Sequence, residues 1–109
     1  MTTDIDRIRE LNDELRRDLI GGSAMITAGV AALGQQFVER VVQTIAVFDD
    51  FHHANDPHAE HDFGAFEVDD YRLFFKIDYY DKSLTGHSHD PSDPTVTERV
   101  ITIMLAEEY

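Results

Sequence analysis

One ten-residue segment, residues 71–80, constrains the fold more than any other part of the chain. Its side chains alternate between two sets with a period of two. The first set is mostly apolar and consists of Tyr71, Leu73, Phe75, Ile77 and Tyr79, and the second set is more polar and consists of Arg72, Phe74, Lys76, Asp78 and Tyr80. Because successive side chains of a strand point to opposite faces of a sheet, the pattern predicts a long strand with one face in the core.

A second strand and a tight turn are predicted directly before this segment. Phe66 and Val68 share one face of that strand. Asp69 and Asp70 then form a two-residue connection to residues 71–80, which indicates a hairpin although glycine, the usual turn residue, is missing. The chain is therefore expected to fold around an antiparallel sheet.

The N-terminal part predicts an amphipathic helix over about residues 3–20. Its apolar face recurs at steps of three and four and consists of Ile5, Ile8, Leu11, Leu15 and Leu19. Thr3 and Asp6 form a capping pair at the start of this helix. The arginines of the segment lie off the apolar face and are expected to be solvated partners of neighbouring acids; they are Arg7, Arg9, Arg16 and Arg17.

A second amphipathic helix is predicted over residues 35–51. Phe37 and Val41 belong to an apolar stripe that is broad enough to indicate packing against a sheet. Residues 23–27 predict a short strand, and residues 96–106, rich in β-branched side chains, predict a last strand rather than a C-terminal helix. The pattern of residues 28–34, between the first strand and the second helix, is ambiguous and predicts no single element.

These elements predict an α+β fold in which two amphipathic helices pack on one face of a mostly antiparallel four-stranded sheet. A length of 109 residues suits a single domain, residues 1–109, with an N-terminal helix and a core over residues 23–109. The chain has no cysteine, which excludes disulfides and thiolate chemistry. No apolar run is long enough to span a bilayer and the N-terminus is acidic, so we expect a cytoplasmic protein without membrane contacts.

The charge is strongly acidic and unevenly distributed. Nine Lys and Arg residues stand against 22 Asp and Glu residues, which gives a net charge of −13. No Lys or Arg lies between Arg40 and Arg72. Such a surface repels phosphate, which excludes direct nucleic-acid binding, and attracts basic proteins. The candidate partner-binding residues are Asp49, Asp50, Asp56, Glu60, Glu67, Asp69 and Asp70. The alternative is that the charge serves solubility alone.

A second candidate site is a loop metal centre. All six histidines lie between residues 52 and 89. His58, His61 and Asp62 offer imidazole and carboxylate ligands of the kind that zinc and related divalent ions take, with Glu60 as the base of a metal-dependent hydrolase. The spacing is not that of a helical zinc protease, and solvated loop histidines are the alternative.

The end of the long strand supplies a third candidate site. Asp78 and Tyr80 share a face with Lys76, and Asp81 follows directly, so acid–base chemistry and an ordinary ion pair are both open. The chain contains no nucleophile-elbow serine motif and no phosphate-binding glycine-rich loop. Whether the protein is an enzyme therefore stays open, and the sequence favours a non-enzymatic role without a resident cofactor.

Several blocks of the chain resemble a small bacterial domain-of-unknown-function family, met in proteobacterial genomes, plasmids and islands. They read LNDxLR from Leu11, TxGV from Thr27, NDPHxEHDFGAF from Asn55, KIDYYD from Lys76 and RVxTIMLAEEY from Arg99. The resemblance implies a mobile-element setting and a shared site formed by Glu60, His61, Asp78, Tyr80 and Asp81. It also implies that Ala59 stands where the family usually has glycine.

Three functions follow as hypotheses. The first is a non-enzymatic interaction protein that binds a basic, nucleic-acid-handling protein, as a nucleic-acid mimic directed against CRISPR or restriction machinery. The second is the small metal-binding protein or metal-dependent hydrolase described above. The third is an oligomeric scaffold or antitoxin-like protein in which the N-terminal helix mediates self-association into a homo-oligomer.

Overall fold

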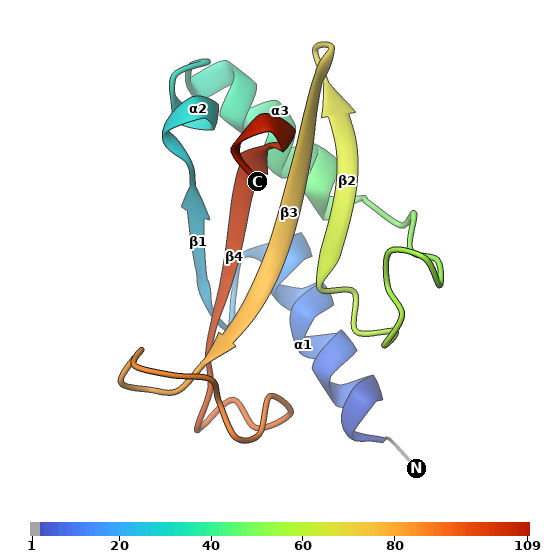
Figure 1. The fold of residues 1–109 in the computed structure, drawn as a ribbon, viewed down its shortest axis with the longest axis vertical. Coiled ribbons are helices and arrows are strands. Elements are labelled where there is room, and N and C mark those ends of the chain that lie inside the picture. Colours follow the sequence, from blue (N-terminus) through green and yellow to red (C-terminus); the bar gives the residue numbers. More distant parts are fainter. Residues whose placement is uncertain (1–2) are drawn as a thin grey trace.

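The alternating segment forms β3 (Tyr71–Tyr80), the longest strand of the structure, a computed structural model that describes residues 3–109 (Figure 1). The remaining elements, in chain order, are α1 (Asp4–Asp18), β1 (Ser23–Ile26), α2 (Ala28–Ala31), α3 (Gln35–Ala46), β2 (Phe63–Val68), β4 (Glu98–Leu105) and the 3₁₀ turn η1 (Ala106–Glu108). The predicted last strand is thus confirmed, and the unassigned residues before α3 form the single helical turn α2. Within the described residues, no helix is both long and apolar enough to cross a membrane.

The four strands form one mixed sheet in the order β1-β4-β3-β2. β3 pairs antiparallel with β2 on one side and with β4 on the other, whereas β1 runs parallel to β4 at the edge. The predicted α+β class with a mostly antiparallel four-stranded sheet is therefore confirmed. The predicted hairpin turn is also present: Asp69 and Asp70 have φ of 52° and 68°, a left-handed conformation that aspartate tolerates better than most residues.

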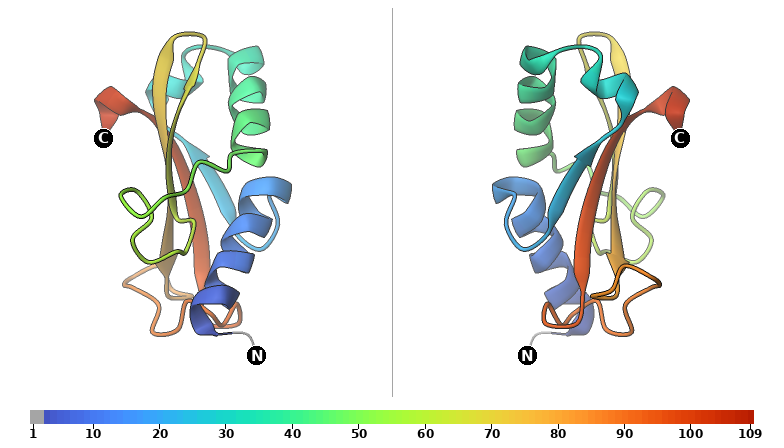
Figure 2. Two further views of the ribbon diagram at one scale, coloured as in Figure 1. Left: turned by 90° about the vertical axis from the view of Figure 1, so that its right-hand side faces the viewer. Right: turned by 90° about the vertical axis from the view of Figure 1, so that its left-hand side faces the viewer.

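The core lies between the sheet and the helices. Figure 2 shows α1 and α3 on the same side of the sheet, and η1 on the opposite side. Leu73, Phe75 and Ile77 of β3 are at most 4% exposed and pack with Val41 of α3 and Leu15 of α1. On the other face of the sheet no long helix covers β3 and β4 within the described chain, so side chains such as Val100 and Thr102 remain half-buried.

The second helix ends earlier than the sequence predicts, at Ala46 instead of residue 51. Phe48 and Phe51 lie beyond the helix but return to the core, where the Phe48 ring centroid lies 5.4 Å from that of Phe75. Arg16 of α1 donates hydrogen bonds to the main-chain oxygens of Ile45 and Phe48. The helix can end here because a side chain from another element satisfies the carbonyl groups that its last turn leaves free.

The first helix has the predicted start but a different buried face. Thr3 Oγ1 accepts a hydrogen bond from the Asp6 N–H and the Asp6 carboxylate accepts one from the Thr3 N–H, which confirms the capping pair. Ile5 and Leu19, expected in the core, are each 46% exposed. Arg16, expected in solvent, is 1% exposed. The prediction for Arg16 was wrong because the polar groups at the end of α3 lie on the core side of α1.

Candidate functional site

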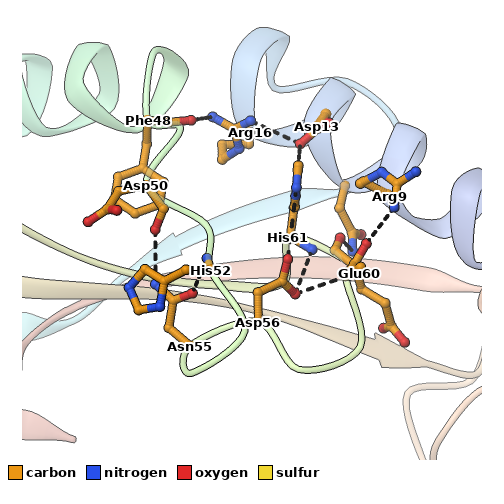
Figure 3. Close-up of polar contacts among 12 residues, drawn as sticks. Arg9, Asp13, Arg16, Phe48, Asp50, His52, Asn55, Asp56, Glu60 and His61 are labelled. Carbon is orange, nitrogen blue, oxygen red and sulfur yellow. Dashed lines mark hydrogen bonds and ion pairs between the residues drawn. The ribbon is translucent and has the colours of Figure 1, made fainter.

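The segment that joins α3 to β2, residues 47–62, is called here the acidic loop. It contains Asp49, Asp50, Asp56, Glu60 and Asp62 and neither Lys nor Arg. Figure 3 shows that this loop lies against α1, with side chains of the helix reaching its main chain. The base-free stretch of the sequence is therefore held in place by cations from elsewhere in the fold.

Three side chains on one face of α1 hold the acidic loop and the end of α3 through main-chain oxygens. They are three and four residues apart, so they line up along the helix. The bonds run from Arg9 Nη1 to Ala59 O at 2.9 Å, from Asn12 Nδ2 to Glu60 O at 2.9 Å, from Arg16 Nη1 to Ile45 O at 2.9 Å and from Arg16 Nη1 to Phe48 O at 2.6 Å. Each arginine gives Nη1 to backbone carbonyls and Nη2 to a carboxylate of α1 itself, Asp6 for Arg9 and Asp13 for Arg16. The carboxylates of the loop are therefore left without an arginine.

The His61 side chain stabilises the acidic loop through contacts within the loop and with α1. Its ring stacks on Phe51 with the centroids 3.8 Å apart, and its Nδ1 lies 2.9 Å from Asp13 Oδ1. Its Nε2 lies 3.8 Å from Asp56 Oδ2. Asp56 is only 7% exposed, and its Oδ1 accepts the main-chain N–H groups of Glu60 and His61. Asp56 therefore stabilises the turn of the loop and is not free to meet a partner.

Asp13 is ionised although it is partly buried. Burial raises its pKa, but hydrogen bonds from Arg16 and His61 outweigh this and leave the pKa below its ordinary value. An ionised carboxylate only accepts hydrogen bonds, so the Nδ1 of His61 must carry the proton. The Arg16 guanidinium also lies 5.2 Å from the Phe51 centroid, which completes its contacts with the loop.

A second buried network joins α1, β3, β4 and the loop. Arg99 Nε donates to Asn12 Oδ1 at 2.7 Å, and Asn12 Nδ2 donates to the Tyr79 hydroxyl at 2.7 Å. The Tyr79 hydroxyl donates to Glu60 Oε1 at 2.8 Å. Burial raises the pKa of Tyr79 and lowers that of Arg99. The network therefore keeps a neutral phenol between a cation and an anion, an arrangement that positions Glu60.

The predicted metal ligands do not converge. His61 faces the aspartates described above, whereas His58 is exposed on the loop. Asp62 lines a separate hollow at the end of β3. In the part of the chain that the structure describes, no three histidine or acidic side chains are placed to hold a metal ion. The metal hypothesis thus receives no support from the geometry.

The end of β3 carries a hollow of about 350 Å³ that contains part of the predicted family site. Its wall is formed by Asp62, Ile77, Asp78, Tyr79, Tyr80, Gly86 and His87. Burial, followed by the like charge of Glu60, raises the pKa of Asp62. Asp81, in contrast, caps a turn. It accepts hydrogen bonds from the Thr85 N–H and the Ser83 hydroxyl, which lower its pKa.

The seven predicted partner-binding acids do not form one surface. Asp56 is buried, and Glu60 accepts the Tyr79 hydroxyl. At the hairpin, Asp69 binds Arg40, and Glu67 lies 3.7 Å from Arg72. Figure 1 places this hairpin turn at the top of the sheet, whereas the acidic loop lies beside the start of β2. Asp49, Asp50 and Asp70 are the members of the set that are exposed and lack a Lys or Arg nitrogen within 4 Å among residues 3–109.

Sequence reasoning missed the buried polar residues that position the loop. Arg99 could have been found, because it has the same parity along β4 as the core residues Ile101 and Ile103. Asn12 and Arg16 sit beside Leu11 and Leu15 on α1 and are buried with them. Nothing in the helical pattern distinguishes these two from solvated residues at the edge of an apolar face.

Comparison with known proteins gives a family but no function. No curated protein and no solved structure matches the chain. A family model described as a protein of unknown function (DUF3768) matches residues 26–108. The match includes the acidic loop, the hollow at the end of β3 and β4, whereas the α1 side chains that hold the loop precede it. The chain belongs to the DUF3768 family of proteins of unknown function.

Proposed function

We propose that this protein is a non-enzymatic interaction protein and that its acidic loop binds a basic protein partner. The proposal rests on one observation: the carboxylates of the loop are not paired with lysine or arginine. Asp49, Asp50, Glu60 and Asp62 have no Lys or Arg nitrogen within 4 Å in the described chain, although Arg9 and Arg16 lie close by. Uncompensated carboxylates on a fixed loop attract cations and steer a basic partner.

The rigidity of the loop supports the same function. The loop is held by α1 through main-chain oxygens and by His61 stacked on Phe51. A loop held in this way loses little conformational entropy when it binds, so its charges are pre-organised for a partner.

The class of partner follows from the charge. An anionic surface competes with phosphate for proteins that grip DNA or RNA, so the proposed partner is a nucleic-acid-handling protein. The chain resembles a bacterial domain family met in genomes, plasmids and islands, and this mobile-element setting favours a target in host defence, of the CRISPR or restriction type. Neither the metal hypothesis nor the oligomer hypothesis is favoured by a specific contact among residues 3–109.

The test is capture on the immobilised chain at low salt, elution with rising salt, and measurement of Kd with the purified partner. We expect the affinity to fall at least about tenfold between low and physiological salt, because exposed charges are screened over about 10 Å at 0.1 M. We also expect weaker binding for D49N/D50N. The matched control is E10Q/E14Q on α1, which removes the same charge away from the loop. Equal affinity at all salt concentrations would reject the proposal.

A further inference from the structure

Two hollows adjoin at one residue near the end of β3, Tyr80. The first is the acidic hollow at the end of β3, with Asp62 and Asp78 in its wall. The second has a volume of about 320 Å³, and its wall is formed by Met25, Tyr80, Leu84, Val100 and Thr102. Tyr80 belongs to both walls, so a ligand in one hollow lies next to the other.

The strand register places the second hollow on the open face. Met25 of β1 pairs with Thr102 of β4, and Asp78 of β3 pairs with Val100 of β4. Directly paired residues point to the same face of a sheet. Their face is the one that carries Tyr80 and is not covered by the long helices (Figure 2). The second hollow therefore opens on this face. The first hollow lies at the end of β3 and takes in residues of both parities, Asp78 and Tyr80 on this face and Ile77 and Tyr79 on the other.

The two hollows have different chemistry. In the first, Asp62 accepts no side-chain hydrogen bond within residues 3–109, and Asp78 Oδ2 lies 3.4 Å from Lys76 Nζ. The other residues of its wall include Tyr80 and His87. In the second, Met25 and Leu84 are 58% and 61% exposed, which is unusual for large apolar side chains that lie together.

We propose that one arginine side chain of the basic partner occupies the acidic hollow and that an adjacent apolar side chain occupies the hollow between Met25 and Leu84. This inference rests on the proposed function and names the segment of the partner that binds. Arginine fits better than lysine because its planar guanidinium donates to carboxylates in pairs and stacks on aromatic rings such as Tyr80. The aliphatic neighbour removes Met25 and Leu84 from water.

The test is an NMR titration of the full chain with the tripeptide acetyl-Leu-Arg-Leu amide. We expect saturable shifts of the amide signals of Met25, Tyr80 and Gly86, which lie along the two hollows. The same peptide with citrulline in place of arginine keeps the shape but loses the charge. We expect it to bind about tenfold more weakly, since charge-assisted hydrogen bonds are about twice as strong as neutral ones.

Variants of the chain separate this inference from the proposed function. D62N/D78N should weaken the arginine peptide about tenfold, and M25S about threefold, by loss of the carboxylates and of the apolar contact. D69N/D70N, with the same change of charge at the hairpin turn, should bind as the wild type does within about twofold. Signal dispersion of each variant reports whether it is folded.

Three results would overturn the inference. One is shifts confined to the acidic loop around Asp50, in which case the proposed function stands and the hollows are not its site. Another is equal binding of the arginine and citrulline peptides. The third is equal weakening by D62N/D78N and D69N/D70N. If, instead, no basic protein and no basic peptide binds the wild-type chain at all, the inference and the proposed function fail together.

Discussion

The acidic loop and the β2–β3 hairpin are both rich in carboxylates, but the arginines beside them have different hydrogen-bond partners. At the hairpin, Arg40 binds the Asp69 carboxylate directly, and Arg72 lies 3.7 Å from Glu67. At the loop, Arg9 donates to the main-chain oxygen of Ala59, and Arg16 donates to those at the end of α3. The hairpin is therefore largely neutralised, while the loop is fixed in shape and keeps its charge.

The comparison shows that a count of charges along the chain does not describe a surface. The acidic loop and the turn of the hairpin, Asp69 and Asp70, both belong to the same base-free stretch of sequence, residues 41–71. Their electrostatics differ because the arginines beside them bind different acceptors, carboxylates at the hairpin and main-chain carbonyls at the loop. A guanidinium that binds backbone carbonyls orders a loop without cancelling its carboxylates. This is the property that a binding loop for a basic partner requires.

The largest expected effect comes from removing the cation that holds the loop. In R16A, the oxygens of Ile45 and Phe48 lose their donor and Asp13 loses its closest cation. We expect a loss of about 3 kcal/mol in the free energy of unfolding, because removal of one partner from a buried ion pair leaves the other uncompensated. Chemical denaturation measures the loss, and hydrogen exchange should report faster exchange in the acidic loop.

The neighbouring residue supplies the control for this experiment. Arg17 follows Arg16 on α1 but is exposed and makes no ion pair with the described residues. R17A also removes an arginine side chain and should change the free energy of unfolding by less than about 0.5 kcal/mol. Similar losses in R16A and R17A would mean that α1 contributes only its general charge, and the comparison between loop and hairpin would lose its basis.

A smaller effect is expected from the strained backbone of the loop. Ala59 has φ of 57°, a left-handed conformation that costs alanine about 1 kcal/mol and glycine almost nothing. A59G should therefore raise the free energy of unfolding by up to about 1 kcal/mol, as measured by denaturation. The control is A54G in the same loop, where φ is not positive and the added freedom of the unfolded chain should destabilise. Destabilisation by A59G would contradict the assigned backbone.

Residue 59 also shows how much of the structure can be predicted from the sequence. The resemblance of the chain to its family implies glycine at residue 59, and the left-handed φ gives the physical reason. Local patterns likewise predicted β3, the hairpin and the cap of α1, because these depend on neighbours in sequence. The end of α3 could not be predicted, since it depends on Arg16, which is 29 residues from Ile45 along the chain.

The candidate site was predicted only in part for the same reason. Asp78 and Tyr80 were found from their place at the end of a strand, and they do line a hollow. The meeting of Tyr80 with Met25 depends on the pairing of β1 with β4, two strands far apart in sequence. No period or motif within one segment contains such information. The neutralisation of Asp69 by Arg40 is equally non-local in origin.

The comparison can be sharpened by giving the hairpin the uncompensated charge of the loop. R40Q/R72Q removes the two cations that face Asp69 and Glu67. All four side chains are at least 47% exposed, so stability should fall by no more than about 0.5 kcal/mol. Binding of the basic partner to the hairpin should appear as new NMR shifts there. K82Q, which also unpairs a surface acid but away from the hairpin, should produce none of these shifts.

The smallest expected effect concerns Asp62, the carboxylate at the end of the loop. Burial and the charge of Glu60 raise its pKa, so the folded state holds the proton more tightly than the unfolded chain does. The stabilisation from the protonated form is complete below the ordinary pKa of aspartate, about 3.9, and is lost as pH rises through the raised pKa. D62N should therefore be slightly more stable than the wild type at neutral pH and equal to it in acid, as thermal unfolding across pH will measure.

D81N is the matched control with the opposite sign, because hydrogen bonds lower the pKa of Asp81, and it should lose stability at neutral pH. The same sign for both variants would mean that Asp62 is compensated after all, and the loop would then resemble the hairpin.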